Sequence, residues 1–162
     1  MSAAAAISAP LDVHAGGRAI SQGFGMAYTR SFLKSLKTKA LAKLGQFPGL
    51  YDRDAVLAAR TLYEFDNVVM APLHGFRDTD DYWSTATIRA HLKRIQLPTL
   101  VLNDPFLPEF ALPSPAEVLP CVMLDQPNHG GHVDFMTGPF PGRIDWLSMR
   151  LFGYFDTFSA RD

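Results

Sequence analysis

His129-Gly130-Gly131-His132-Val133-Asp134-Phe135 follows the short apolar run Cys121-Val122-Met123-Leu124, and these two segments decide how the sequence is interpreted. The apolar run has the length and composition of a buried strand. The two glycines after it allow a sharp turn with positive φ angles. His132 would then stand on a tight loop beyond a strand, where a histidine can serve as a general base. In the alternative interpretation, a histidine caps the loop or hydrogen-bonds the backbone.

A second polar turn follows another predicted strand. Leu97–Leu102 is rich in β-forming residues, and Asn103-Asp104-Pro105 turns directly out of it. With a helical turn over Ala116–Leu119 and a helix after the histidine turn, this part of the chain has a βαβα order. Crossovers of this kind make the strands parallel, so both polar turns would emerge at the C-terminal edge of the sheet, where open α/β folds bind ligands. We therefore predict that Asp104 and His132 lie on neighbouring loops as an Asp–His pair.

The composition restricts the class of protein. The chain has 162 residues, enough for one domain with a sizeable core, and 48% of them are hydrophobic. A net charge of −1 gives no overall field that would favour nucleic acid. The single cysteine, Cys121, excludes an internal disulfide and a cysteine-based zinc site. The sequence has no apolar run of about 18 residues and no basic flank typical of a secretory signal, so we expect a cytoplasmic protein.

The N-terminal half is predicted to be mostly helical. Met26–Phe47 has helical periodicity, and its apolar stripe consists of Phe32, Leu33, Leu36, Ala40, Leu41 and Leu44. Basic residues lie mostly beside or opposite this stripe, and no acidic residue occurs between Asp12 and Asp52. The main interpretation is a solvated basic face above a packed stripe. Weak contact of this basic helix with an anionic membrane surface is the alternative.

Further helices are predicted over Asp54–Phe65, Asp81–Ile95 and Arg143–Phe158. Pro72 and Gly75 are expected to interrupt the chain after the first of these. The acidic run Asp78-Thr79-Asp80-Asp81 lacks the glycine and terminal glutamate of a calcium-binding EF-hand loop, so we interpret it as a helix cap. From composition alone, the small-residue run Ala3–Ala9 is expected to be a frayed terminus rather than a strand.

Segments along nearly the whole chain match those of one protein family, and in the same order. They are Ile7-Ser8-Ala9-Pro10-Leu11, Arg30-Ser31-Phe32-Leu33, Lys39-Ala40-Leu41, Glu64-Phe65-Asp66, His74-Gly75-Phe76, Asp81-Tyr82-Trp83, Ile95-Gln96-Leu97-Pro98-Thr99-Leu100, Asn103-Asp104-Pro105-Phe106-Leu107-Pro108 and His129-Gly130-Gly131-His132-Val133, with Trp146. Singly most of these segments are weak signals, but together they are specific. The chain resembles the C-terminal portion of a YheT-like α/β hydrolase, a family of serine hydrolases and carboxylesterases.

The resemblance implies an α/β fold. It makes residues 1–162 a single partial α/β-hydrolase domain with about three parallel strands, flanking helices and a helical cap. Residues 16–81 would form the cap, and residues 82–162 would form the core that carries the acid and histidine loops. It also implies, against the composition, that Ala5–Pro10 is a strand. The free edge of that strand would pair with an N-terminal half that this chain lacks.

The resemblance also implies roles for two residues. In α/β hydrolases the catalytic residues follow the chain order serine, acid, histidine. Asp104 matches the acid of the family, and His132 matches the base in its Gly-Gly-His motif. The base takes a proton from the serine, while the acid orients the imidazole and stabilises its charged form. The expected substrate is a small-molecule ester with an apolar acyl chain, and no cofactor is implied.

Two features depart from the family pattern. No Gly-x-Ser-x-Gly nucleophile elbow occurs in the sequence. Ser21 has a small residue two positions before and after it but no strand ahead, and Ser8 has Pro10 two positions on. We therefore expect the chain alone to be inactive. The segment between Leu100 and Asp104 is shorter than in the family, which would draw Asp104 back from the loop apex and put its reach to His132 in question.

Two further interpretations stay open at this level. One is a non-catalytic, truncated remnant or an interaction module that keeps the cap and the strands but performs no chemistry. The other is a metal site formed by Asp125, His129, His132 and Asp134. The spacing of the two histidines allows it, but the sequence offers no supporting hydrogen-bond partners for such ligands.

Overall fold

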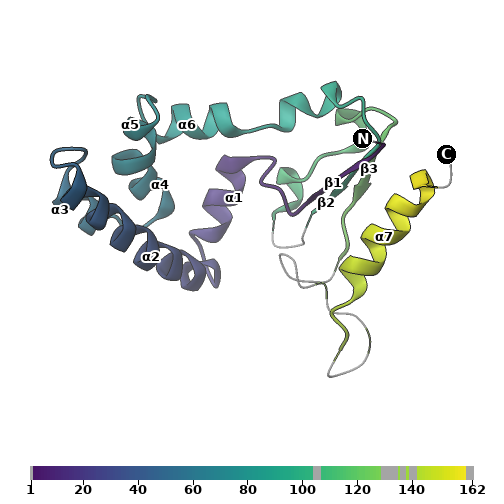
Figure 1. Cartoon of the computed structure of the whole chain (residues 1–162), viewed down its shortest axis with the longest axis horizontal. Coiled ribbons are helices and arrows are strands. Elements are labelled where there is room, and N and C mark those ends of the chain that lie inside the picture. Colours follow the sequence, from purple (N-terminus) through teal and green to yellow (C-terminus); the bar gives the residue numbers. More distant parts are fainter. Residues whose placement is uncertain (1, 104–106, 129–134, 136–137, 139–141, 160–162) are drawn as a thin grey trace. The chain divides into compact units, whose positions relative to one another are not determined.

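The computed structural model describes residues 2–103, 107–128, 135, 138 and 142–159 (Figure 1). The chain divides into two compact units. The first, which we call the sheet unit, comprises Met1–Asp12 and Ile88–Asp162. The second, the helical unit, is Val13–Thr87. The chain therefore leaves the sheet unit after its first strand and returns to it before the second.

The sheet unit contains three parallel strands, as predicted. They are β1 (Ala4–Ile7), β2 (Thr99–Leu102) and β3 (Val122–Asp125), paired in the order β1-β2-β3. Ala5 pairs with Leu100, and Leu100 pairs with Met123. The expectation of a frayed terminus from composition was wrong, because the small residues of β1 gain hydrogen bonds and packing from β2 that composition does not reveal. The strand that the resemblance implied is present.

The central strand β2 separates two apolar clusters. All four of its residues are buried, and alternate side chains point to opposite faces of the sheet. On one face, Leu100 and Leu102 pack with Phe135 and Tyr154, the latter from α7 (Trp146–Ser159). On the other face, the buried residues are Leu11, Leu92, Val101 and Val122. The predicted final helix is therefore present, and it covers one face of the sheet.

The connection from β2 to β3 differs from the predicted βαβα order. Its described residues form only two 3₁₀ turns, Glu109–Ala111 and Pro115–Glu117, and the second replaces the predicted helical turn Ala116–Leu119. Five prolines stand in this connection, at positions 105, 108, 113, 115 and 120. Because proline lacks a backbone donor and clashes with the preceding helical turn, the segment does not sustain an α-helix. The strands are nevertheless parallel, as predicted.

The helical unit begins with α1 (Val13–Ile20) and α2 (Gly25–Gln46). The second confirms the predicted helix over Met26–Phe47. Leu33 and Ala40 of its expected apolar stripe are buried, but Phe32 is 49% exposed, so its place in the buried stripe was wrong. A polar residue, Thr29, is fully buried instead, and its hydroxyl donates a hydrogen bond of 2.7 Å to the carbonyl of Ile20.

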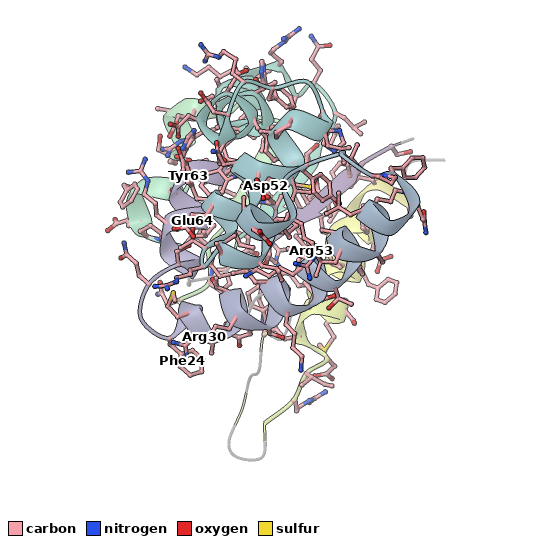
Figure 2. The ribbon with its side chains drawn as sticks, turned by 90° about the vertical axis from the view of Figure 1, so that its left-hand side faces the viewer. Phe24, Arg30, Asp52, Arg53, Tyr63 and Glu64 are labelled. Atoms are coloured by element: carbon pink, nitrogen blue, oxygen red, sulfur yellow. The ribbon has the colours of Figure 1, made fainter. Side chains whose placement is uncertain are left out.

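The predicted helix over Asp54–Phe65 is broken into two. Its parts are α3 (Arg53–Ala58) and α4 (Leu62–Phe65); Figure 2 labels Asp52 and Arg53 at the start of α3 and Tyr63 and Glu64 in α4. The carboxylate of Asp52 accepts hydrogen bonds from the backbone of Asp54 and Ala55 and so starts α3. The hydroxyl of Thr61 accepts one from the backbone of Glu64 and starts α4. A threonine that caps a new helix competes with continuation of the old one, which explains the break.

The remaining helices correct two boundaries. A π-helical turn, Asp66–Met70, leads into α5 (Ala71–Leu73), so the chain stays helical through Pro72. Proline is tolerated there because it stands in the first turn of α5. The stop comes at Gly75, with φ +79°. Asp78 caps α6 (Thr79–Ala86) as predicted, but α6 ends well before Ile95 and is followed by a 3₁₀ helix, Arg89–Arg94.

We predict that Gly17→Ala destabilises the protein by about 1 to 3 kcal/mol, because a methyl group there would overpack the site. The added Cβ would lie 2.3 Å from the Trp83 ring, and this ring is 4% exposed. Gly45→Ala in α2 is the matched control, since its Cβ would meet nothing within 4 Å. That substitution should raise the free energy of unfolding by as much as about 1 kcal/mol, because alanine favours a helix more than glycine does. Urea unfolding of both variants measures the difference; equal stability of Gly17→Ala and the unmutated protein would contradict this packing.

Candidate functional site

The two loops that carry the predicted catalytic pair leave the same edge of the sheet. β2 and β3 are adjacent and parallel, and the backbone N–H of Asn103, the residue after β2, donates a 3.0 Å hydrogen bond to the carbonyl of Asp125, the last residue of β3. Asp104 comes next after Asn103. Asp104 and His132 lie outside the described residues, so their pairing stays a prediction, as does the effect of the shortened segment before Asp104.

The described residues at this edge include an unusual buried amide. Asn103 is 1% exposed, and its Nδ2 donates a 3.1 Å hydrogen bond to the carbonyl of Ala9. Its Oδ1 has no hydrogen-bond partner among the residues that the structure describes. A buried acceptor without a partner costs free energy, so it favours a donor brought to this position. Asn103 thus links the ends of β1 and β2 and offers an acceptor in the residue that precedes Asp104 in the sequence.

Ser8, one of the two serines considered as nucleophile, follows β1 at the same edge. Its φ of +48° is uncommon for a residue other than glycine, and a strained turn after a strand is also a property of a nucleophile elbow. However, Ser8 is only 4% exposed, and the next helix begins at Val13 rather than directly after the turn. The hydroxyl of Ser21, the other candidate, donates a 2.6 Å hydrogen bond to the carbonyl of Gly17. Neither is placed as an elbow serine.

Asp125, a member of the possible metal site, is occupied by another interaction. Its carboxylate accepts a 2.6 Å hydrogen bond from Nε of Arg150 on α7. This ion pair ties the end of β3 to the helix that covers the sheet. The other three candidates, His129, His132 and Asp134, lie outside the described residues. Within the described ranges no three metal-ligating side chains come together.

An ion pair fixes the connection that follows Asp104. Arg89 binds Glu117 through two nitrogens, at 2.7 and 3.0 Å, and donates a third hydrogen bond to the carbonyl of Phe110. Glu117 also accepts from the backbone and hydroxyl of Ser114. These hydrogen bonds, those from Arg89 foremost, lower the pKa of Glu117 to about 2. The contacts hold both 3₁₀ turns of the connection in place.

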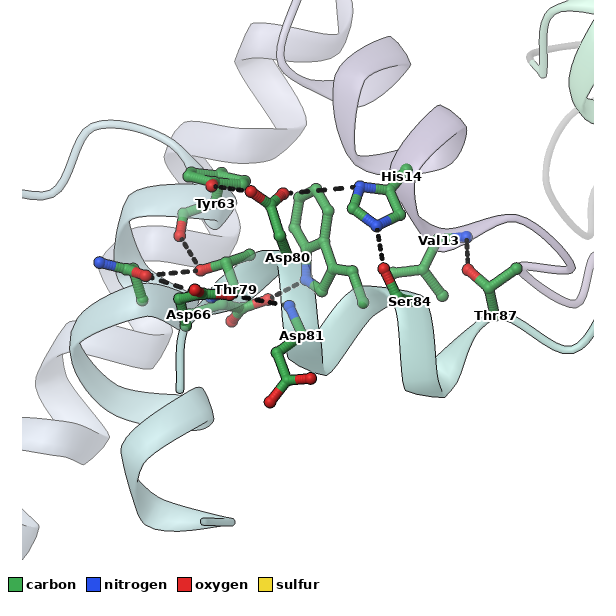
Figure 3. A network of polar contacts seen from close by, with 12 residues as sticks. Val13, His14, Tyr63, Asp66, Thr79, Asp80, Asp81, Ser84 and Thr87 are labelled. Atoms are coloured by element: carbon green, nitrogen blue, oxygen red, sulfur yellow. Dashed lines mark hydrogen bonds and ion pairs between the residues drawn. The ribbon is translucent and has the colours of Figure 1, made fainter. Parts of the chain in front are cut away.

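The helical unit contains a polar network that the sequence did not predict (Figure 3). The indole N–H of Trp83 donates a 2.7 Å hydrogen bond to the carboxylate of Asp66. Burial raises the pKa of Asp66, and the hydrogen bond from Trp83 opposes that rise. The hydroxyl of Thr79 donates to the carbonyl of Tyr63 at 2.9 Å, and the Tyr63 and Trp83 rings meet edge to face. The network joins α4, the π-helical turn and α6.

Within this network a serine, a histidine and an aspartate lie in series. Nε2 of His14 is 3.1 Å from the hydroxyl of Ser84, and its Nδ1 is 3.9 Å from Asp80 (Figure 3). Ser84 lies inside α6, where backbone N–H groups are used by the helix and cannot stabilise an oxyanion. Asp80 is 66% exposed and also accepts from the Tyr63 hydroxyl. We therefore interpret this series as a link between α1 and α6.

A broad groove of about 400 Å³ opens on the helical unit between α2 and the segment after α3. Met26, Leu33 and Ala59 are its apolar lining residues, and four cationic side chains complete the lining: Arg30, Lys34, Lys37 and Arg60. The ammonium of Lys37 donates a 2.7 Å hydrogen bond to the carbonyl of Leu57. Apolar and cationic surface together suit a ligand with both an apolar and an anionic part.

Comparison with known proteins establishes the relationship. YheT of Escherichia coli, described as a candidate esterase, is 32% identical over 161 residues, which are 96% of this chain and 47% of YheT. The chain belongs to the YheT-like α/β hydrolases. The phospholipase ABHD3 of Mus musculus is 35% identical, and the monoacylglycerol lipase ABHD2 of Homo sapiens is 30% identical; each match covers 64% of the chain and 26% of the relative.

The YheT-like chain thus spans about half the length of YheT and about a quarter of the other two relatives. No family model matches it, and no solved structure matches it significantly. The family membership agrees with the three parallel strands and flanking helices of the sheet unit. Asp66 and Trp83 both lie in sequence segments that match the family. The family match therefore singled out both residues, but it did not reveal that they hydrogen-bond to each other.

We predict that Glu117→Gln lowers the free energy of unfolding at neutral pH by about 1 kcal/mol, since an ion pair at a partly exposed site contributes little more. The ionised form of Glu117 stabilises the fold above its ordinary pKa of 4.5, and this stability is lost as the pH falls towards about 2. The difference between variant and unmutated protein should therefore shrink across that range. Unfolding at a series of pH values measures it, with the exposed Glu109→Gln as control. A pH-independent difference would contradict the assignment.

We predict that Asp66→Ala is less stable than Asp66→Asn by about 1 to 2 kcal/mol, because only asparagine keeps an acceptor for the Trp83 indole. The raised pKa of Asp66 means that the unmutated protein loses stability as the pH rises from its ordinary 3.8 through the raised value. Asp66→Asn lacks that loss. Denaturant unfolding from acidic to neutral pH tests both points, and equal stability of the two variants would show that the indole hydrogen bond contributes nothing.

Proposed function

We propose that this chain contributes the acid and the base of a serine ester hydrolase, with Asp104 as the acid and His132 as the base. The observation that carries the proposal is the match to YheT along 96% of the chain. The arrangement of β2 and β3 supports it, because adjacent parallel strands bring their following loops to one edge of the sheet. Asn103, buried at the end of β2, anchors the residue at which the acid loop starts.

In the proposed mechanism, His132 removes the proton from a serine hydroxyl as the oxygen attacks the ester carbonyl. The imidazolium then protonates the leaving alcohol, and a water molecule activated by the same histidine releases the acid. Asp104 keeps the imidazole in the productive tautomer. No serine of the 162 residues stands in a Gly-x-Ser-x-Gly elbow, so we propose that the nucleophile is a serine outside them. The chain alone would then be inactive.

We propose an ester with an apolar acyl chain as the substrate. Two of the relatives described above are named as enzymes that act on lipid esters, one a phospholipase and the other a monoacylglycerol lipase. The groove of the helical unit combines apolar lining with cations, which suits an amphiphilic lipid better than a small polar ester. We keep the assignment of residues 16–81 as a cap over the substrate as part of this proposal.

A non-catalytic interaction module is the second candidate function. β1 pairs with β2 on one side, and no strand of the described part of the chain pairs with its other side. An apolar strand edge of this kind favours pairing with another polypeptide. We propose that a segment homologous to the N-terminal half of the family pairs with this edge of β1. An interaction module would keep this strand pairing and would lack catalysis.

A chimera tests the catalytic proposal. We predict that a chimera in which this chain replaces the matching region of YheT hydrolyses a p-nitrophenyl ester, and that His132→Ala then lowers this hydrolysis by roughly a thousandfold or more. Asp104→Asn should also lower it strongly, because the imidazole would lose its orienting partner. Labelling with a fluorophosphonate reports separately whether a serine is activated.

The chain without any added segment is the control. We expect no fluorophosphonate labelling of it, with Ser8→Ala, Ser21→Ala and Ser84→Ala compared in parallel. Labelling that disappears in one of these variants and in His132→Ala would show that the nucleophile lies within the 162 residues. A folded chimera that shows neither hydrolysis nor labelling would favour the interaction module.

A further inference from the structure

A row of exposed aromatic side chains runs along α2. Phe24, which directly precedes the helix, is 79% exposed, Tyr28 is 52% exposed and Phe32 is 49% exposed. Steps of four residues place all three on one side of the helix. The rings of Phe24 and Tyr28 meet edge to face with their centroids 6.0 Å apart, and Figure 2 shows Phe24 projecting from the ribbon at the edge of the view. We call these three residues the aromatic row.

Positive charge accompanies the aromatic row. Lys39 and Lys43 continue the same side of α2, and Nζ of Lys43 lies 5.1 Å from the ring centroid of Phe47, which is 52% exposed. The helix carries five cations and no acid: Arg30, Lys34, Lys37, Lys39 and Lys43. Throughout the described part of the chain, no ion pair joins any of them to a carboxylate. Two of these cations, Lys39 and Lys43, thus lie beside the aromatic row, whereas Arg30, Lys34 and Lys37 line the groove described above.

We propose that α2 docks on an anionic phospholipid surface, with the aromatic row at the level of the headgroups and the lysines on the phosphates. Aromatic rings favour the boundary between water and hydrocarbon, and each lysine near an anionic surface adds to the attraction. The proposal goes beyond ester hydrolysis, because it assigns a surface that works whether or not the chain is catalytic. No helix that the structure describes has the length and hydropathy to cross a bilayer.

Other occupants fit the surface less well. A second copy of the chain would bring Lys39 and Lys43 of one copy against the same residues of the other, and this repulsion of like charges opposes association. A nucleic acid would neutralise the lysines, but a row of rings along a convex helix offers no groove in which successive bases could stack. A bound nucleic acid would leave Phe24 and Phe32 in water, whereas a bilayer would remove both rings from water.

Vesicle flotation with the chain tests the proposal. We expect binding to vesicles of phosphatidylcholine mixed with phosphatidylglycerol and much weaker binding to phosphatidylcholine alone. Phe24→Ser combined with Phe32→Ser should lower the affinity for the mixed vesicles roughly tenfold or more, through lost insertion. Lys39→Gln combined with Lys43→Gln should lower it by a similar factor and should leave binding to neutral vesicles unchanged.

The sheet unit provides matched controls. Phe110 and Phe152 are 71% and 69% exposed, and Lys93 and Arg94 are exposed cations. Serine or glutamine at these positions should leave vesicle binding unchanged. Circular dichroism shows whether each variant is folded. The proposal is overturned if the folded chain does not bind anionic vesicles, if both sets of variants behave alike, or if the row binds an oligonucleotide in preference to lipid. None of these readouts needs hydrolysis, so this proposal and the esterase proposal can fail separately.

Discussion

The pairing of β2 between two parallel neighbours is the constraint on which the sheet unit depends. A strand buried on both faces must bond its backbone on both sides, since unpaired backbone groups in an apolar interior are costly. Thr99–Leu102 satisfies this with β1 on one side and β3 on the other. Because both pairings are parallel, each of the three strands ends at the same edge. Every polar turn of the sheet unit that we consider for function leaves from that edge.

At that edge, side-chain hydrogen bonds and ion pairs, and not additional strand residues, fix the backbone. The side chain of Asn103 donates to the backbone beyond β1, and its backbone N–H donates to Asp125 at the end of β3, so one buried residue joins the three strand ends. The ion pair of Arg150 with Asp125 attaches β3 to α7, and that of Arg89 with Glu117 holds the proline-rich connection. Loops fixed at both ends lose less entropy when they adopt one conformation. Loops anchored on a rigid strand edge are therefore suited to position catalytic side chains.

The sequence predicted the parallel strands, the long helix α2 and the cap at Asp78, because each has a local signature: an apolar run, a helical period or an acidic residue before a helix. Composition alone misjudged β1, since a run of alanines becomes a strand only through its neighbour, and only the family resemblance implied that strand. The sequence also missed the break before Thr61 and the helical path through Pro72, where a capping hydroxyl and the position of proline within a turn decide the outcome. The contact of Asp66 with Trp83 joins residues far apart in sequence, and no local pattern contains it.

The two sides of α2 show why a single hydrophobic period was misleading. Leu33 and Ala40 pack against Val56 and Phe65 and give the helix its buried side, while a second set of large apolar residues, spaced by four, lies on the exposed side. The hydrophobic periodicity of the sequence does not distinguish the two sides, so it places Phe32 in the core. Folding of the helical unit alone does not account for that second set, because aromatic rings left in water contribute nothing to stability. A chain that keeps them beside Lys39 and Lys43, which no described carboxylate pairs with, has a surface whose favourable partner is apolar and anionic together.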